Sequence, residues 1–161
     1  MARADLTKVT TLDWVVVGAG LLAYISSFLP WYRTDLSVLG IERSATANAW
    51  NAGIGAWLPV LLLVGAGVVV LASATGVRLP TSKPLITLGL SALAVIAILL
   101  RWMTYPSATG QSRLDMDNVE VEGLLAVSSG AGFGLYLGLI AAIAAVVASL
   151  LTARAAGAIL S

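Results

Sequence analysis

Histidine and cysteine are both absent from this 161-residue sequence. Without them there is no haem held by a His or Cys ligand and no ordinary zinc or copper site. There is also no cysteine nucleophile and no disulfide. Membrane enzymes that exchange disulfides are therefore excluded, as are intramembrane proteases that use zinc or a Ser/His pair.

Charged residues are also few. Lysine and arginine together number 9 and the acidic residues 8, so that 11% of the residues are charged and the net charge is +1. A soluble domain carries about 25% charged residues. A protein that follows a nucleic-acid backbone needs clustered Lys and Arg, and no such cluster is present. These features exclude a soluble globular protein and predict no nucleic-acid partner.

Apolar residues make up 59% of the sequence and gather in four long blocks. A helix needs about 20 apolar residues to cross about 30 Å of hydrocarbon, and each block reaches that length. The blocks do not alternate as the strands of a membrane barrel do. We predict an all-α membrane protein with one domain over residues 1–161. It is a four-helix transmembrane bundle in the lipid bilayer, with helices at 12–32, 54–77, 84–102 and 124–151.

Local signals mark the helix ends. Thr10 and Asp13 have the spacing of a capping box, and Pro84 suits the first turn of the third helix. Aromatic residues gather near the loop ends of three blocks, where amphipathic rings collect at a membrane surface. The predicted interfacial anchors are Trp31, Tyr32, Trp57, Trp102 and Tyr105.

Basic residues set the expected orientation. Arg78 and Lys83 lie in the short turn between the second and third blocks, where the positive-inside rule has most force. We therefore expect a multi-pass plasma-membrane protein with both termini in the cytoplasm. The longer loops, 33–53 and 103–123, would then face outward.

The two outer loops contain alternating apolar and polar residues, over Leu36–Ile41 and over Leu114–Val121. This period is typical of half-exposed strands and predicts a small β element that joins the loops. The acidic residues of the second loop lack the spacing of a calcium-binding loop, so no metal is expected. The predicted outer-loop interaction residues are Trp50, Asp115, Asp117, Glu120 and Glu122.

Small residues recur every four positions in the fourth block, at Gly130, Gly134, Gly138 and Ala142. Residues with this spacing share one helix face, and such a glycine zipper lets another helix approach closely. The row predicts helix packing, either against the protein's own helices or between two copies of the chain.

Ionisable residues are missing from the central parts of all four blocks, whereas proton relays and charged-substrate pathways require them. No nucleophile stands beside a base, so no enzymatic activity and no cofactor are expected. The favoured function is an accessory or assembly subunit that binds other membrane proteins, or further copies of itself, through helix faces and outer loops. The alternative is a passive pore or carrier for an apolar or lipid-like substrate.

Three short segments carry a resemblance: Phe28–Tyr32, Trp57–Pro59 and the glycine-rich Gly130–Tyr136. Together with the composition, they resemble small, uncharacterised four-helix integral membrane proteins of actinobacteria. The resemblance implies the same membrane architecture and brings no particular activity with it.

Overall fold

The protein is described by a computed structural model. It covers residues 9–38, 41–77, 82–104, 110–111, 114–116, 119–121 and 125–159. For the short strands between residues 110 and 127, only the backbone is described.

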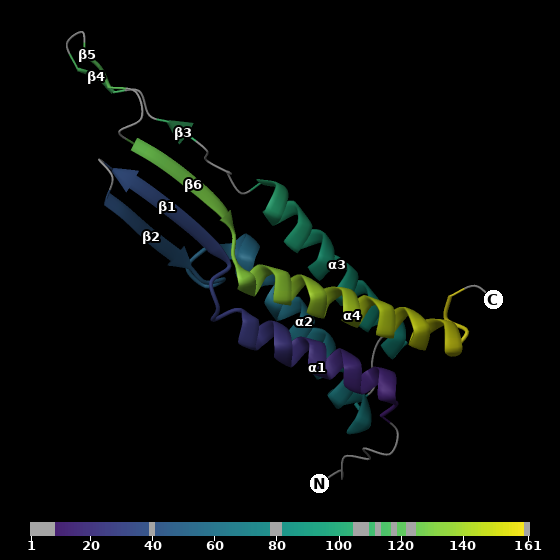
Figure 1. Ribbon diagram of the computed structural model, residues 1–161. Helices are drawn as coiled ribbons and strands as arrows, with labels where there is room; N and C mark the ends of the chain where they lie inside the picture. Colours follow the sequence, from purple (N-terminus) through teal and green to yellow (C-terminus); the bar gives the residue numbers. More distant parts are fainter. Residues whose placement is uncertain are drawn as a thin grey trace.

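Four helices form a bundle beneath a sheet (Figure 1). Each helix packs against two others, so that the neighbours around the bundle are α1 and α2, α2 and α3, α3 and α4, and α4 and α1. Three of the helices are long and apolar enough to cross a membrane, and α1, with 16 residues, is shorter. Their bounds are Thr11–Ser26 for α1, Ile54–Ala74 for α2, Lys83–Thr104 for α3 and Phe133–Ala155 for α4.

The sheet rises from one end of the bundle (Figure 1). Its strand order is β2-β1-β6-β3, and all three neighbouring pairs are antiparallel. The strands are β1 (Tyr32–Val38), β2 (Ile41–Ala47), β3 (Gly110–Gln111) and β6 (Leu125–Ala131). Two further short strands, β4 (Leu114–Met116) and β5 (Val119–Val121), pair with each other. Because β1 follows α1 and β6 precedes α4, the sheet continues two helices of the bundle.

The predicted first and fourth helices were too long. The first ends at Ser26 and the fourth begins at Phe133, because 32–38 and 125–131 are paired strands. The short run of apolar and small residues in β6 does not by itself distinguish a strand from a helix, and pairing with β1 satisfies the backbone of β6 as a helix would. The second and third helices lie within a few residues of their predicted bounds.

A β element does join the two loops, but the predicted pairing of its strands was wrong. Leu36 faces Arg43 of β2 on one side and Val127 of β6 on the other. The strands β4 and β5 pair with each other instead, with Asp115 opposite Glu120. The alternation of apolar and polar residues shows which side chains share a face of a strand. Which strands pair with each other depends on which helix ends the bundle brings together.

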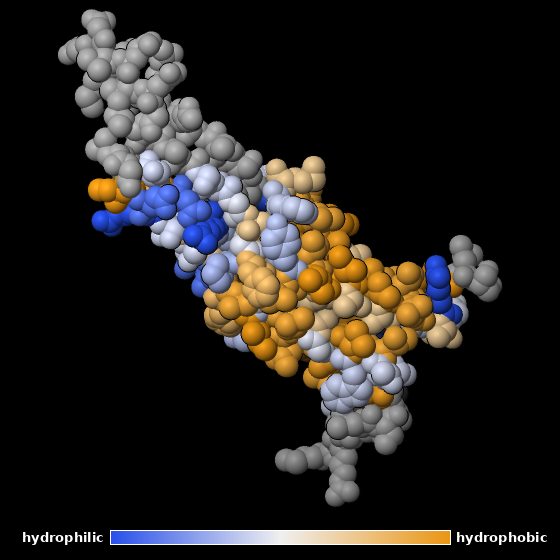
Figure 2. Space-filling view, in the orientation of Figure 1, coloured by the Kyte–Doolittle hydropathy of each residue, from blue (hydrophilic) through white to orange (hydrophobic). Residues whose placement is uncertain are grey.

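The surface divides into an apolar body and a polar extension. Figure 2 shows hydrophobic residues over the helices and hydrophilic residues over the sheet. Large apolar side chains of the helices are exposed, among them Leu21, Val68 and Ile140. On α3, Lys83 and Arg101 lie about 27 Å apart at 1.5 Å per residue, close to the thickness of about 30 Å of a hydrocarbon layer. The helical body therefore has the dimensions of a membrane-embedded domain.

Two glycines bring α1 and α2 into close contact. A Cβ added to Gly20 would lie 2.7 Å from the Leu63 carbonyl oxygen, and one added to Gly67 would lie 3.4 Å from the Val17 Cα. Because lipid tails are as apolar as leucine, membrane helices associate through such dense packing. Because Gly20 and Gly67 have no side chains, they set how closely α1 and α2 approach each other.

We predict that Gly20→Ala destabilises the protein by about 1–3 kcal/mol, because the new methyl group meets a backbone atom that cannot turn aside. Thermal unfolding in mild detergent measures the effect. Gly18→Ala is the matched control on the same helix, since nothing lies within 4 Å of its Cβ position. Equal melting temperatures for the two variants would contradict this account of the α1–α2 contact.

Candidate functional site

Trp31 occupies the junction between bundle and sheet. It follows the proline that ends the turn after α1, it directly precedes β1, and it is fully buried. Its indole Nε1–H donates to the Ser26 carbonyl at 2.8 Å, and its backbone carbonyl accepts from the Gly132 N–H at 2.7 Å. One residue therefore links the end of α1, the start of β1 and the chain entering α4.

Two glycines of α4 make room for this indole. A Cβ on Gly134 would lie 2.6 Å from the Trp31 Cδ1 atom, and one on Gly138 would lie 3.0 Å from its Cζ2 atom. Before them, a Cβ on Gly132 would collide with the Pro30 carbonyl oxygen. Gly134 and Gly138 thus pack against a tryptophan of their own chain, and Ala142 is buried further along α4.

Gly130 does not belong to this row, which corrects the sequence-based prediction. It lies in β6, is exposed, and has nothing within 4 Å of its Cβ position. The four-residue spacing places residues on one face only where the chain is helical, and the helix begins at Phe133. Gly132, which the spacing did not include, takes its place at the junction as the N-cap of α4.

Trp31 and Tyr32 were predicted to be interfacial anchors, and this was wrong. Their exposed fractions are 0% and 1%, so neither ring reaches a membrane surface. The Arg101 guanidinium lies 5.5 Å from the centre of the Tyr32 ring and donates a hydrogen bond to the Ala52 carbonyl at 2.7 Å. At this distance a cation is attracted by the ring, so Arg101 ties α3 to the sheet and to the start of α2.

Two further aromatic pairs lie at the sheet end of the bundle. Trp50 donates from Nε1 to the Ser27 hydroxyl at 2.9 Å and stacks on Trp57, with ring centres 6.4 Å apart and planes 11° from parallel. Trp102 meets Tyr136 edge to face at 6.1 Å. Trp50 was assigned from the sequence to an outer-loop interaction. It is instead held against the end of α1 and the start of α2. The predicted anchor Tyr105 lies outside the described residues.

The acidic outer-loop residues are only partly described. Asp115 and Glu120 face each other in the register of β4 and β5, and Asp117 and Glu122 lie outside the described residues. Within the part of the chain that the structure covers, no group of three His, Cys, Asp or Glu residues could hold a metal ion. The interaction surface assigned to these four residues stays a prediction.

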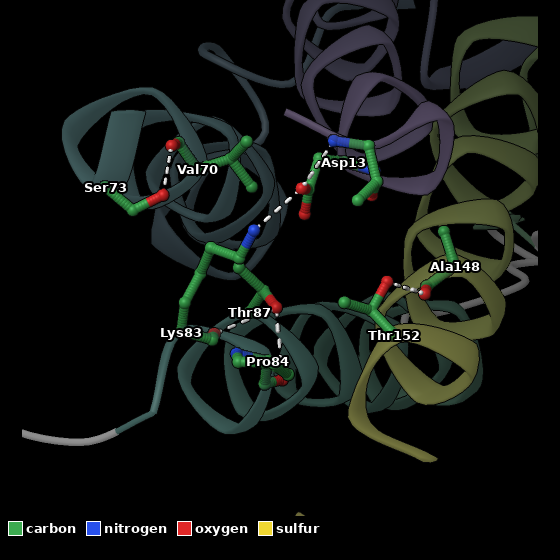
Figure 3. Close-up of polar contacts among 9 residues, drawn as sticks. Asp13, Val70, Ser73, Lys83, Pro84, Thr87, Ala148 and Thr152 are labelled. Carbon is green, nitrogen blue, oxygen red and sulfur yellow. Dashed lines mark hydrogen bonds and ion pairs between the residues drawn. The ribbon is translucent and has the colours of Figure 1, made fainter. Parts of the chain in front are cut away.

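An ion pair fastens the opposite end of the bundle (Figure 3). The Lys83 Nζ atom lies 2.7 Å from Oδ2 of Asp13, a carboxylate that is only 3% exposed. The capping box predicted at Thr10 and Asp13 is confirmed, with both reciprocal hydrogen bonds present. Among the contacts drawn in Figure 3, the hydroxyls of Ser73, Thr87 and Thr152 donate to carbonyls of their own helices. The ion pair instead joins α1 to α3, which are not packed side by side.

No family model, curated protein or solved structure matches this chain. The structure shows a junction of an indole, three glycines and a cation that holds a sheet on an apolar bundle.

We predict that Gly134→Ala destabilises the protein by about 1–3 kcal/mol, because its methyl group meets the indole of Trp31 and the Ser26 carbonyl together. Gly130→Ala is the control, since its Cβ position is open, and it should melt with the wild type. Size-exclusion chromatography of both variants adds a second readout. If Gly134→Ala only dissociated an oligomer and left a stable folded monomer, the glycine face would pack between subunits instead.

Removal of Lys83 should be costly. We expect Lys83→Met to lower the free energy of unfolding by about 3 kcal/mol, because it leaves the buried Asp13 carboxylate without its cation. The double variant Asp13→Asn with Lys83→Met should regain part of that loss. Denaturant unfolding in detergent compares four proteins, namely the wild type, Lys83→Met, Asp13→Asn and the double variant, and additive losses would show that the two side chains are not coupled.

Proposed function

We propose that this chain is a non-enzymatic, four-span protein of the plasma membrane, an accessory or assembly subunit that presents its sheet to other membrane proteins. The observation that carries the proposal is the sheet, which is fixed to the bundle by Trp31 and exposed over β2. Every residue from Ile41 to Thr46 is exposed. A surface held this firmly above a membrane is suited to bind a neighbour without a large ordering cost.

The short helix α1 is included as a span because both of its ends are tied to those of its neighbours. Its start is joined to the first residue of α3 by the Asp13–Lys83 pair, and its end is joined to the start of α4 through Trp31. At 1.5 Å per residue α1 is about 24 Å long. A bilayer accommodates such a segment by thinning slightly at modest cost.

The proposed orientation places the sheet outside and both termini in the cytoplasm. The start of α1 and the end of α4 lie at the end of the bundle opposite the sheet (Figure 1). Lys83 and Arg154 also lie at that end, and basic residues next to short loops favour the cytoplasmic side. The aromatic residues Trp50, Trp57 and Trp102 would mark the outer surface of the bilayer.

Cysteine labelling tests this orientation without background, because the sequence has no cysteine. Ser44→Cys on β2 should react with a membrane-impermeant thiol reagent on intact cells. Thr75→Cys, exposed after α2, should react only after the membrane is permeabilised. The reverse pattern would invert the orientation.

Co-purification in mild detergent tests the function. We expect another membrane protein to be recovered in a fixed ratio with the wild type, and to be lost when Ile41 and Ser44 are both changed to lysine. Val68→Ala, on the exposed face of α2, is the control and should retain the partner. A single species without a partner, with measurable flux of an apolar solute in liposomes, would favour the passive pore or carrier.

A further inference from the structure

The outer edge of β2 is long and regular. Its seven residues pair with β1 in one continuous register, from Val38 opposite Ile41 to Tyr32 opposite Ala47. Such a register leaves no place for a bulge. In the part of the chain that the structure describes, no strand pairs with the other side of β2. One row of its backbone groups therefore faces outward.

The register identifies these outward groups. The Trp31 carbonyl accepts from the Gly132 N–H, next to β6, and the Trp31 N–H donates to the Ala47 carbonyl at 2.9 Å, so Ala47 directs its carbonyl toward β1. Because antiparallel strands alternate the direction of their hydrogen bonds, Tyr32, Thr34 and Leu36 pair toward β2. Their partners are Ala47, Ala45 and Arg43. The remaining residues of β2, namely Glu42, Ser44 and Thr46, direct their N–H and C=O groups to the open edge.

This edge lacks the usual protection. Sheet proteins block exposed edges with proline, lysine, a bulge or a covering element. From Ile41 to Ala47 the strand contains neither proline nor lysine, and its only charged residues are Glu42 and Arg43 near the tip. The part nearest the bundle, from Ser44 to Ala47, is uncharged and small. Another strand can therefore approach it closely.

We infer that the β2 edge binds an extended segment of a different membrane protein, which pairs antiparallel to β2. The inference rests on the proposed function and specifies the site and the kind of partner. β2 runs from the tip of the sheet toward the bundle, so an antiparallel partner runs away from the bundle (Figure 1). In a membrane protein, a segment that follows directly after a span on the sheet side has this direction, as β1 has after α1.

The direction of β2 disfavours a second copy of this chain as the partner. Two copies in one membrane share an orientation, so both β2 strands run toward the membrane. The strands lie roughly along the axis of the bundle (Figure 1), and a pair of them would therefore be parallel. Parallel pairing is slightly less stable per residue than antiparallel pairing.

The edge also defines the chemistry of its partner. About seven residues in extended form, roughly 23 Å, would follow a membrane span with few or no intervening residues. Proline is excluded at each position that donates to Glu42, Ser44 or Thr46. Opposite charges are favoured beside Arg43 and Glu42, because like charges directly opposite each other are destabilising.

A designed probe tests the direction of pairing. In the first probe, a single membrane-spanning helix is followed directly, on the sheet side, by a copy of the Tyr32–Val38 sequence. In the second, the same sequence precedes the helix and so runs toward the membrane. Each is reconstituted with the full-length chain in nanodiscs. The first probe should slow amide exchange at Glu42, Ser44 and Thr46 by at least about tenfold, and the second should not.

Two variants of the chain make the test specific to the backbone. Ser44→Pro removes one outward N–H and should abolish the protection at Glu42 and Thr46, whereas Ser44→Ala should keep it. The amides of Thr34 and Leu36 should stay protected in both variants, which shows that the β1–β2 pair is intact. Equal protection by the two probes, or none by either, would overturn the inference.

Crosslinking in native membranes identifies the natural occupant. A photoreactive residue at Thr46 should capture a different protein through residues that directly follow one of its spans, and Ser44→Pro should prevent the capture. A product of two copies of this chain would overturn the inference. Capture of a different protein at Thr46 that survives Ser44→Pro would also overturn it, while leaving the proposed function standing, because the partner would then bind the sheet without pairing to its backbone.

Discussion

The packing of Trp31 against Gly134 and Gly138 is the contact on which the rest of the structure depends. The indole takes space that two absent side chains leave on α4, and its N–H satisfies a carbonyl at the end of α1. Because β1 begins at the next residue and Gly132 lies just after β6, this one contact sets where the sheet stands on the bundle. The Asp13–Lys83 pair has the matching role at the other end, where it holds α1 against the start of α3.

The Trp31–glycine packing and the Asp13–Lys83 ion pair both suit a protein in lipid. Helices there gain little from hydrophobic association, so close packing and a few buried polar contacts must hold them together. The glycine contacts between α1 and α2 and between α4 and Trp31 supply the first. The ion pair and the Arg101 contacts with Tyr32 and Ala52 supply the second.

In the proposed accessory role, the sheet gives the helical body a surface that can select a partner. Lipid-facing helix surfaces are chemically alike, whereas a strand edge offers directional hydrogen bonds. In the proposed orientation, the height and angle of this edge relative to the membrane would also restrict which segments can pair with it. In the proposed accessory role, the bundle supplies the position and β2 supplies the recognition.

The sequence by itself determined the membrane class, the bounds of α2 and α3 to within a few residues, the capping box at Thr10 and the small-residue face of α4. These follow from composition and local periodicity, which need no knowledge of distant neighbours. Only the tertiary structure decided that 125–131 is a strand, that Trp31 and Tyr32 are buried, and that Gly134 and Gly138 make room for an indole beside the end of α1. Each of these depends on which segments meet after folding. An apolar run or an aromatic pair has the same local signal whether it faces lipid, a strand or the core, so its environment had to come from the fold.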